Sequence, residues 1–250
     1  MLKEEKIRYA RQLSHPGFTE KNQLKLRNAK VLIAGVGGLG GAIAHGLVCA
    51  GIGRLEIIHY GVLEEPDLNR QTLMGENGVG ISRALLASER LKEISSLVQI
   101  EAHDKAVTEK VLEEICDGVD LIIDARHNFP ERKILNTFAV TKNIPLLFAA
   151  MNGMESQAAL FVPEKTGCLN CLYPENPQDW DPFGFSVFGA VSHTIGSMAA
   201  MIAIKFLSGY GEVDETLISL NMETMKLRHF KLHKDPSCLI CGCERHGLRI

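Results

Sequence analysis

The stretch from Val31 to Gly53 reads VLIAGVGGLGGAIAHGLVCAGIG, and it decides the fold. Four apolar residues precede a glycine-rich segment and an apolar pattern of helical spacing, which predicts a strand, a tight turn and a helix. Glycines in the turn let backbone N–H groups approach an anion and let the helix pack close to its strand. Phosphate would bind at the helix N-terminus, where unpaired N–H groups and the helix dipole favour negative charge. Four glycines are therefore nucleotide-binding candidates: Gly35, Gly37, Gly38 and Gly40.

Strand and helix patterns alternate through the first 150 residues, with further strands expected at 55–58, 98–102, 119–124 and 145–149. This alternation predicts a doubly wound, mostly parallel α/β sheet of the Rossmann type, with its ligand at the carboxyl ends of the strands. The pattern then changes to a strand at 157–162, an apolar helix at 190–207 and a hairpin over 216–230. We expect residues 1–150 to form a nucleotide-binding part with N-terminal helices, and 151–250 a C-terminal lobe of the same overall domain.

Composition and charge exclude several classes of protein. The chain has 250 residues, of which 46% are hydrophobic, and its net charge is −3 without a basic stripe, so nucleic acid is not an expected partner. The apolar segment at 190–207 is interrupted by His193 and Lys205, which favours a buried core helix over a membrane span. The N-terminal residues are charged and lack the apolar region of a secretory signal, so a cytoplasmic protein is expected. On their apolar helix faces, His45 and His193 are typical of structural core histidines.

Two C-x-x-C pairs, CLNC and CLIC, lie far apart in the chain. Four thiolates from two such pairs form a closed tetrahedral set that suits structural Zn²⁺, which would join the segment after residue 162 to the C-terminal tail. The alternatives are ordinary reduced cysteines or one redox-active pair. The expected zinc ligands are Cys168, Cys171, Cys238 and Cys241.

Several motifs occur in a fixed order: RYARQ at 8–12, GVGGLGG at 35–41, DLNRQ at 67–71, Asp124 after a strand, IGSMAAMIAIKFLSG at 195–209, and the two cysteine pairs. Together they resemble the ThiF/MoeB/HesA family, bacterial relatives of ubiquitin-activating enzymes. The resemblance implies an enzyme that adenylates a carboxylate with Mg-ATP, releases pyrophosphate, and forms a homodimer.

By position, the resemblance assigns roles to individual residues. The glycine loop would hold ATP, and Arg70 would contact the phosphates. Arg11 would reach into the site of the partner subunit, and Arg83 matches a lysine that stabilises the reacting phosphate. The catalytic candidates are thus Arg11, Arg70 and Arg83, and the further nucleotide-binding candidates are His59, Arg70, Arg83, His127 and Asn128.

The chain departs from the family pattern at several positions. His59 replaces the acidic residue that binds the ribose hydroxyls, and Asp67 replaces an asparagine. His127 replaces the aspartate that handles Mg²⁺, and a neutral imidazole is a poor ligand for a hard cation. With Arg126 nearby, these changes predict a more cationic pocket than in relatives. Residues 172–189 contain no cysteine where many relatives carry a nucleophile, so chemistry would stop at the acyl-adenylate.

The function that these residues favour is ATP-dependent adenylation of a carboxylate. The substrate would be a small-molecule cofactor precursor or the C-terminus of a ubiquitin-like carrier protein. The alternative is a non-catalytic module of the same fold that binds a nucleotide or a partner. A dehydrogenase is disfavoured because His59 stands where NAD enzymes carry an acidic residue. The aromatic residues of 173–188 would either cover a flat ligand or cap the core: Tyr173, Trp180, Phe183, Phe185 and Phe188.

Overall fold

The computed structural model describes residues 1–176, 186–213 and 215–242. One eight-stranded sheet runs through it in the order β3-β2-β1-β4-β5-β6-β7-β8. The first five strands in this order pair in parallel, and β5 to β8 pair antiparallel. The strands are β1 (Lys30–Ala34), β2 (Arg54–Ile58), β3 (Gln99–His103), β4 (Leu121–Asp124), β5 (Leu146–Asn152), β6 (Glu155–Phe161), β7 (Thr216–Asn221) and β8 (Lys226–Lys231). The predicted doubly wound α/β class is confirmed.

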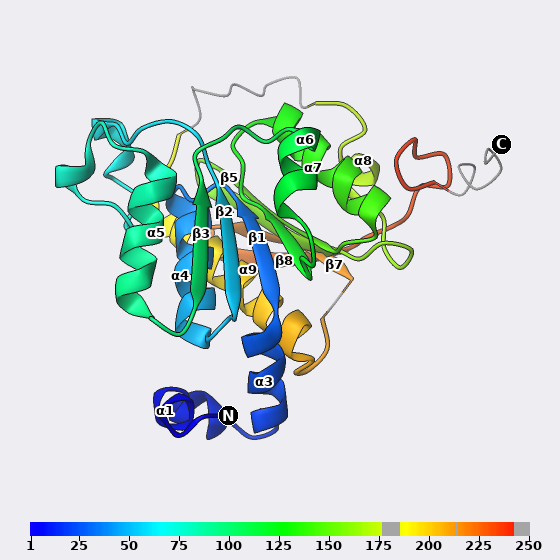
Figure 1. The fold of residues 1–250 in the computed structure, drawn as a ribbon. Helices are drawn as coiled ribbons and strands as arrows, with labels where there is room; N and C mark the ends of the chain where they lie inside the picture. The colour runs from blue at the N-terminus through cyan, green and yellow to red at the C-terminus, as the bar shows by residue number, and fades with distance from the viewer. Residues whose placement is uncertain (177–185, 214, 243–250) are drawn as a thin grey trace.

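Helices cover both faces of this sheet (Figure 1). One face packs against α4 (Gly38–Ala50), α5 (Arg83–Ile94) and α9 (Gly189–Ser208). The other packs against α6 (Glu109–Ile115), α7 (Phe129–Lys142) and the short α8 (Leu169–Leu172). The central strands are buried on both faces, which explains why their sequences are continuous apolar runs without alternation.

The N-terminal helices are α1 (Lys3–Arg8), α2 (Ala10–Leu13) and α3 (Glu20–Asn28), and they lie beyond the amino ends of the strands (Figure 1). The amphipathic pattern at residues 3–13 is thus two helices, since the chain turns at Tyr9, whose ring packs against Gly51 at the far end of α4. At the opposite end of the sheet, the long segment after β2 contains η1 (Glu65–Asp67) and η2 (Glu76–Gly78). Its buried Leu63, Leu73 and Met74 anchor it to the core.

Helix α9 is the one described helix that is long and apolar enough to cross a membrane. It packs instead against β5, β6 and α4, and the residues along its inner face belong to the core. A Cβ at Gly196 would lie 2.7 Å from both the Cβ of Ala42 and the carbonyl oxygen of Leu39. Glycine at this position therefore permits the close approach of α9 to α4.

Pairing within the sheet changes from parallel to antiparallel at the β5–β6 hairpin, near residue 150. The expected division of the chain at residue 150 stays a prediction, and the sheet continues across this position without interruption. The predicted C-terminal hairpin is formed by β7 and β8, with β8 at the sheet edge.

Candidate nucleotide-binding site and cysteine cluster

The glycine loop joins the end of β1 to the start of α4, as the sequence predicts. Gly35 adopts a φ of +96°, in the left-handed region that favours glycine. A Cβ at Gly40 would lie 1.9 Å from the carbonyl oxygen of Gly35, so no other residue fits there. Gly37 is the N-cap, and α4 presents the free N–H groups of its first turn beyond it. This loop has the form of a phosphate cradle.

Arg70 lies directly against the start of α4. A Cβ on Gly38 would come within 3.0 Å of the Cβ and Cγ atoms of Arg70, so the arginine stem packs on the glycine. The backbone oxygen of Arg70 accepts a 2.8 Å hydrogen bond from Nε2 of His193, on α9. His193 is thus a structural histidine, as expected, and it fixes the loop that carries Arg70. The neighbouring Gln71 is buried near Gly37, and its Oε1 has no partner among the described residues.

Asp67 connects Arg70 to Arg83. Its Oδ1 lies 3.0 Å from Nη2 of Arg70, and its Oδ2 lies 3.4 Å from Nη1 of Arg83. Arg83, the first residue of α5, also donates to the backbone oxygen of Tyr60 at 3.1 Å. The structure therefore brings Arg70, Arg83 and the glycine loop together, and one buried carboxylate holds both guanidinium groups.

His59 follows β2 and contacts the glycine loop. Its Nδ1 accepts a 2.8 Å hydrogen bond from the backbone N–H of Val36. The side chain is buried, and burial, followed by the positive charge of Arg126 and Arg83, holds the pKa of His59 well below its ordinary value. The imidazole is therefore neutral at physiological pH, and the bond at Nδ1 assigns its proton to Nε2.

The end of β4 carries two buried ion pairs. Asp124 is fully buried, and its Oδ2 lies 3.0 Å from Nη1 of Arg132. Burial raises the pKa of Asp124, while Arg132 opposes the shift. Arg126 is 2% exposed, and its Nη2 lies 2.7 Å from Oε2 of Glu131, with the ring of Tyr60 5.1 Å from its guanidinium carbon.

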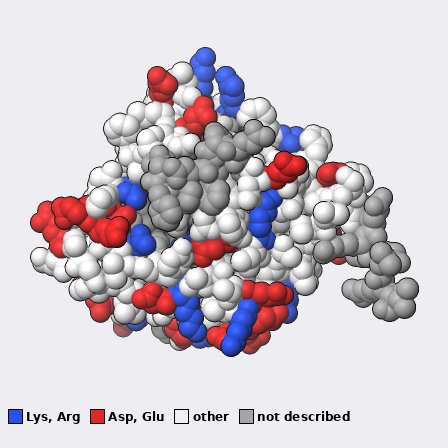
Figure 2. Space-filling view, turned by 90° about the horizontal axis from the view of Figure 1, so that it is seen from above, with Lys and Arg blue, Asp and Glu red and all other residues white. Residues whose placement is uncertain are grey.

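The comparison of the pocket's charge with that of relatives stays a prediction, but neither Arg126 nor His127 adds an uncompensated positive charge to it. The charge of Arg126 is neutralised by Glu131, and burial, followed by the charge of Arg126, lowers the pKa of His127 to about 4. His127 is therefore uncharged at neutral pH. Figure 2 views the molecule from the side of the carboxyl ends of the strands. Over the described part of this face, Lys and Arg are interspersed with Asp and Glu.

Asn128 caps α7. Its Oδ1 accepts a 2.8 Å hydrogen bond from the backbone N–H of Glu131, and its Nδ2 donates to the Glu131 carboxylate. Glu131 was not among the predicted site residues, although it holds Arg126 and also accepts from the backbone N–H of Val107. The spacing of asparagine and glutamate three residues apart at a helix start is a capping pattern, and it could have identified Glu131.

Arg11 lies far from the glycine loop of its own chain. It is exposed on α2, near the C-terminal end of α4, where Gln12 donates to the backbone oxygen of Ala50. The glycine loop is at the other end of this 13-residue helix, about 20 Å away at 1.5 Å per residue. A contribution of Arg11 to catalysis therefore requires a second chain.

The four predicted metal-binding cysteines form one cluster, with all Sγ atoms within 4.8 Å of one another. The Sγ atoms of Cys168 and Cys238 lie 3.8 Å apart, and those of Cys171 and Cys241 lie 3.4 Å apart. These separations exclude disulfides and approach the edge of about 3.8 Å expected for a tetrahedron with Zn–S bonds of about 2.3 Å. The cluster is compatible with a zinc site.

Further donors point at the sulfur atoms. Nδ2 of Asn136, on α7, lies 3.6 Å from Sγ of Cys168, and its Oδ1 accepts from the backbone N–H of Leu169 at 2.9 Å. The backbone N–H groups of Asp235 and Ile240 donate to Cys171 and Cys238 at 3.4 and 3.5 Å. Such N–H···S bonds orient thiolate ligands and disperse their charge.

The predictions for His45 and for the aromatic residues of 173–188 have different outcomes. His45 is exposed on α4, so the prediction that it is a core histidine is wrong. Of the aromatic residues, Tyr173 is half-buried with its hydroxyl 2.6 Å from Oε1 of Gln157, and Phe188 is 58% exposed. Trp180, Phe183 and Phe185 lie outside the described residues.

The ThiF family model matches residues 9–240 of the chain. The heterocyst HesA protein of Trichormus variabilis is 40% identical over 236 residues, covering 94% of this chain and 88% of that protein. The sulfur carrier protein adenylyltransferase of Thermus thermophilus is 34% identical over 255 residues, covering 97% and 93%. Among solved structures, E. coli MccB with ATP has a TM-score of 0.84 at 26% identity, covering 94% of this chain and 73% of that one.

The cysteine cluster predicts the metal content of the protein and its dependence on Asn136. We expect about one zinc per chain, and Asn136→Ala to weaken zinc binding by about 10- to 100-fold through loss of the Nδ2–H···S bond. Competition with a chromophoric chelator measures the affinity. Thr137→Ala, at the next position of α7, is the matched control and should leave the affinity unchanged. Equal affinities in the two variants would contradict the role of Asn136.

The low pKa of His127 predicts an acid-sensitive fold. Between about pH 6.5 and 4 the unfolded chain takes up a proton at this histidine that the folded chain does not, so the free energy of unfolding falls as pH falls. His127→Gln removes this contribution. From pH 7.5 to 4.5 we expect the unmodified chain to lose about 1 kcal/mol more stability than the variant, because solvent screening of this partly exposed side chain reduces the effect of the shift. Urea denaturation across this range measures the difference, and parallel curves would disprove it.

Proposed function

The chain belongs to the ThiF family, and from that premise we propose that it transfers the adenylyl group of ATP to a carboxylate. The observation that carries the proposal is the packing of Arg70 on Gly38 at the start of α4. The stem of Arg70 thus lies beside the free N–H groups of a helix N-terminus, and its guanidinium is held nearby by Asp67 and Asn69. Both groups bind phosphate, and their combination suits a nucleotide triphosphate better than a single anion.

The proposed reaction needs no general base among the residues of the chain. The substrate carboxylate is ionised at neutral pH, and one of its oxygens attacks the α-phosphorus of ATP. The bond to the β-phosphate oxygen breaks, so the products are an acyl-adenylate and pyrophosphate. The first turn of α4 binds the phosphates, and Arg70 with Arg83 stabilises the charge that accumulates on the leaving group.

The described residues do not form a ready set of oxygen ligands for Mg²⁺ at the end of β4. Asp124 is paired with Arg132, Glu131 with Arg126, and His127 stands where the family carries an aspartate. The metal-compatible groups among the described residues are the four cysteines and a set of Glu56, Glu101 and His103 on the sheet. We therefore derive no step through a protein-bound Mg²⁺, and assign the positive charge at the phosphates to the arginines.

For the acyl substrate, we propose a small-molecule cofactor precursor or the C-terminus of a ubiquitin-like carrier protein. The relative from Thermus thermophilus is named for action on a sulfur carrier protein, which supports the second class. Residues 172–189 contain no cysteine, so the acyl-adenylate would pass to a separate nucleophile.

A non-catalytic binding module is the second candidate. It is favoured by the histidines at positions 59 and 127, both neutral, where the family carries carboxylates. Such a site would bind a nucleotide or a partner without turnover.

Pyrophosphate exchange into ATP separates these two functions. We expect exchange that depends on one member of a panel of small heterocyclic carboxylates and a carrier protein ending in Gly-Gly. Arg70→Ala should lower it by about 100-fold, because the guanidinium stabilises charge that develops in the transition state. Arg90→Ala, which removes an exposed arginine paired with Glu93 on α5, is the control and should exchange normally. Measurable ATP binding without exchange for every carboxylate would favour the binding module.

Mixing two variants tests whether Arg11 acts in the site of a partner subunit. Arg11→Ala and Arg70→Ala should each be nearly inactive alone. In a mixed dimer, one site combines Arg70 of one chain with Arg11 of the other, so an equal mixture should recover about a quarter of the unmodified activity after subunit exchange. No recovery, with mixed dimers present by native mass spectrometry, would place Arg11 outside the partner's site.

A further inference from the structure

In doubly wound nucleotide-binding folds, a residue near the end of β2 recognises the ribose of the nucleotide. An acidic side chain near this position accepts hydrogen bonds from the ribose hydroxyls, because it lies across the switch point from the glycine loop. In this chain β2 ends at Ile58 and is followed by His59, Tyr60 and Gly61. The position thus lacks a carboxylate, and the geometry of His59 decides what it does instead.

His59 is held at both its backbone and its ring. Its N–H donates to the carbonyl oxygen of His103 at 3.1 Å, which continues the ladder between β2 and β3. Its ring turns to the glycine loop, where Nδ1 accepts from Val36 at 2.8 Å. The side chain is 5% exposed, so it has little freedom to reorient. The ring nitrogen that remains is a donor, whereas the acidic residue of other sites is an acceptor.

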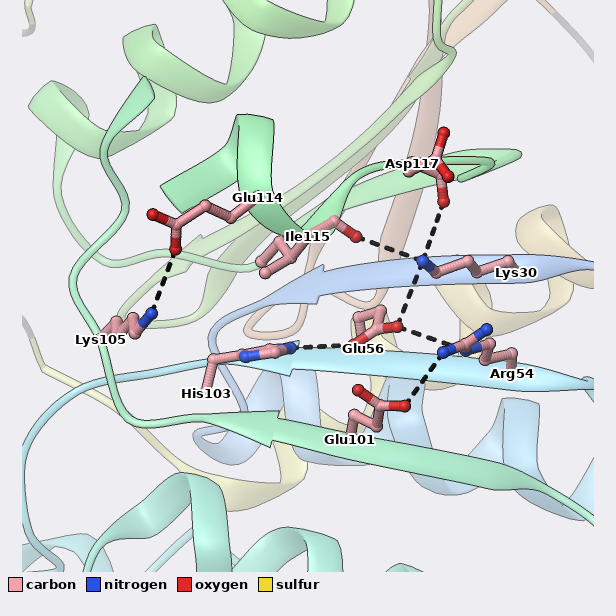
Figure 3. A network of polar contacts seen from close by, with 9 residues as sticks. All are labelled: Lys30, Arg54, Glu56, Glu101, His103, Lys105, Glu114, Ile115 and Asp117. Carbon is pink, nitrogen blue, oxygen red and sulfur yellow. Dashed lines mark hydrogen bonds and ion pairs between the residues drawn. The ribbon is translucent and has the colours of Figure 1, made fainter. Parts of the chain in front are cut away.

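The buried carboxylates described near this end of the sheet are engaged in ion pairs and are not free to replace the missing one. Glu56, two residues before the end of β2, is enclosed by Lys30, Arg54 and His103 from three strands (Figure 3). The three other buried carboxylates nearby each pair with arginine, as described above: Asp67, Asp124 and Glu131. Withdrawing any of these to bind ribose would leave a buried guanidinium uncompensated, at a large cost in free energy.

We propose that His59 is a specificity-determining residue that makes the nucleotide site indifferent to the ribose hydroxyls, so that 2′-deoxy-ATP and 3′-deoxy-ATP bind as well as ATP. The inference rests on the proposed function in taking this end of the sheet as the nucleotide site. Affinity then comes from the phosphates, held by α4 and Arg70, and from the base. His59 instead stabilises the glycine loop, through the hydrogen bond that its ring accepts from the backbone N–H of Val36.

The test compares the dissociation constants of ATP, 2′-deoxy-ATP and 3′-deoxy-ATP for the full chain, measured by isothermal titration calorimetry. For the unmodified chain, we expect each deoxy-nucleotide to bind within about threefold of ATP. His59→Asp should restore an acceptor for the hydroxyls and raise the preference for ATP to about tenfold or more, as for hydrogen bonds to a charged group. His59→Asn keeps an acceptor for the Val36 N–H but adds no charge, and should remain close to the unmodified ratio.

The controls separate this inference from the proposed function. His45→Asp places the same substitution at an exposed histidine of α4 and should leave every ratio unchanged. A preference for ATP above about tenfold in the unmodified chain overturns the inference, whether or not His59→Asp folds. Similar binding of the three nucleotides, without pyrophosphate exchange for any carboxylate, overturns the proposed function and supports the inference. A chain that binds none of the three overturns both.

Discussion

The close approach of α4 to its neighbours is the constraint on which the rest of the structure depends. At its N-terminal end, Gly40 lies so near the carbonyl oxygen of Gly35 that a side chain cannot be accommodated. Along its length, Gly196 allows α9 to lie against the same helix. Close packing places the first turn of α4 beside His193 and Arg70, which belong to distant parts of the chain. A phosphate cradle and the arginine beside it are therefore consequences of one packing arrangement.

Charge at the carboxyl ends of the strands is arranged as buried pairs. Asp67, Asp124 and Glu131 each accept one or two arginines, and all three are largely buried. Such pairs contribute little net stability, because desolvation offsets most of the attraction, but losing one partner is costly. Their effect is to fix the positions of the side chains around the site. This arrangement leaves Arg70 and Arg83 as partly exposed cations with a shared counter-charge, as the proposed binding of phosphate requires.

The parts of the fold that could be predicted from sequence are those that local patterns determine. The strand, glycine turn and helix around Gly35, and the two cysteine pairs, are short motifs whose geometry follows from their own residues. The neutralisation of Arg126 could not be predicted in this way, since the partner of a charge depends on side-chain packing. The exposure of the His45 side chain depends on packing in the same way, so the prediction of a core histidine is wrong. An apolar pattern fixes which residues form a helix, but it cannot fix which part of a glycine-rich helix faces solvent.

Helix α7 links the two functional regions of the molecule. Its N-cap, Asn128, lies beside the arginine pairs at the carboxyl ends of the strands, and its Asn136 contacts the cysteine cluster. These residues are eight positions apart, which corresponds to about 12 Å along one rigid helix. Arg132, on the turn between them, holds Asp124 at the end of β4. A metal on the four thiolates would therefore stabilise, through this helix, the position of the strand end at which the nucleotide is proposed to bind. The cysteine cluster is distant from the proposed reaction, but it contacts the helix that holds one side of the proposed site.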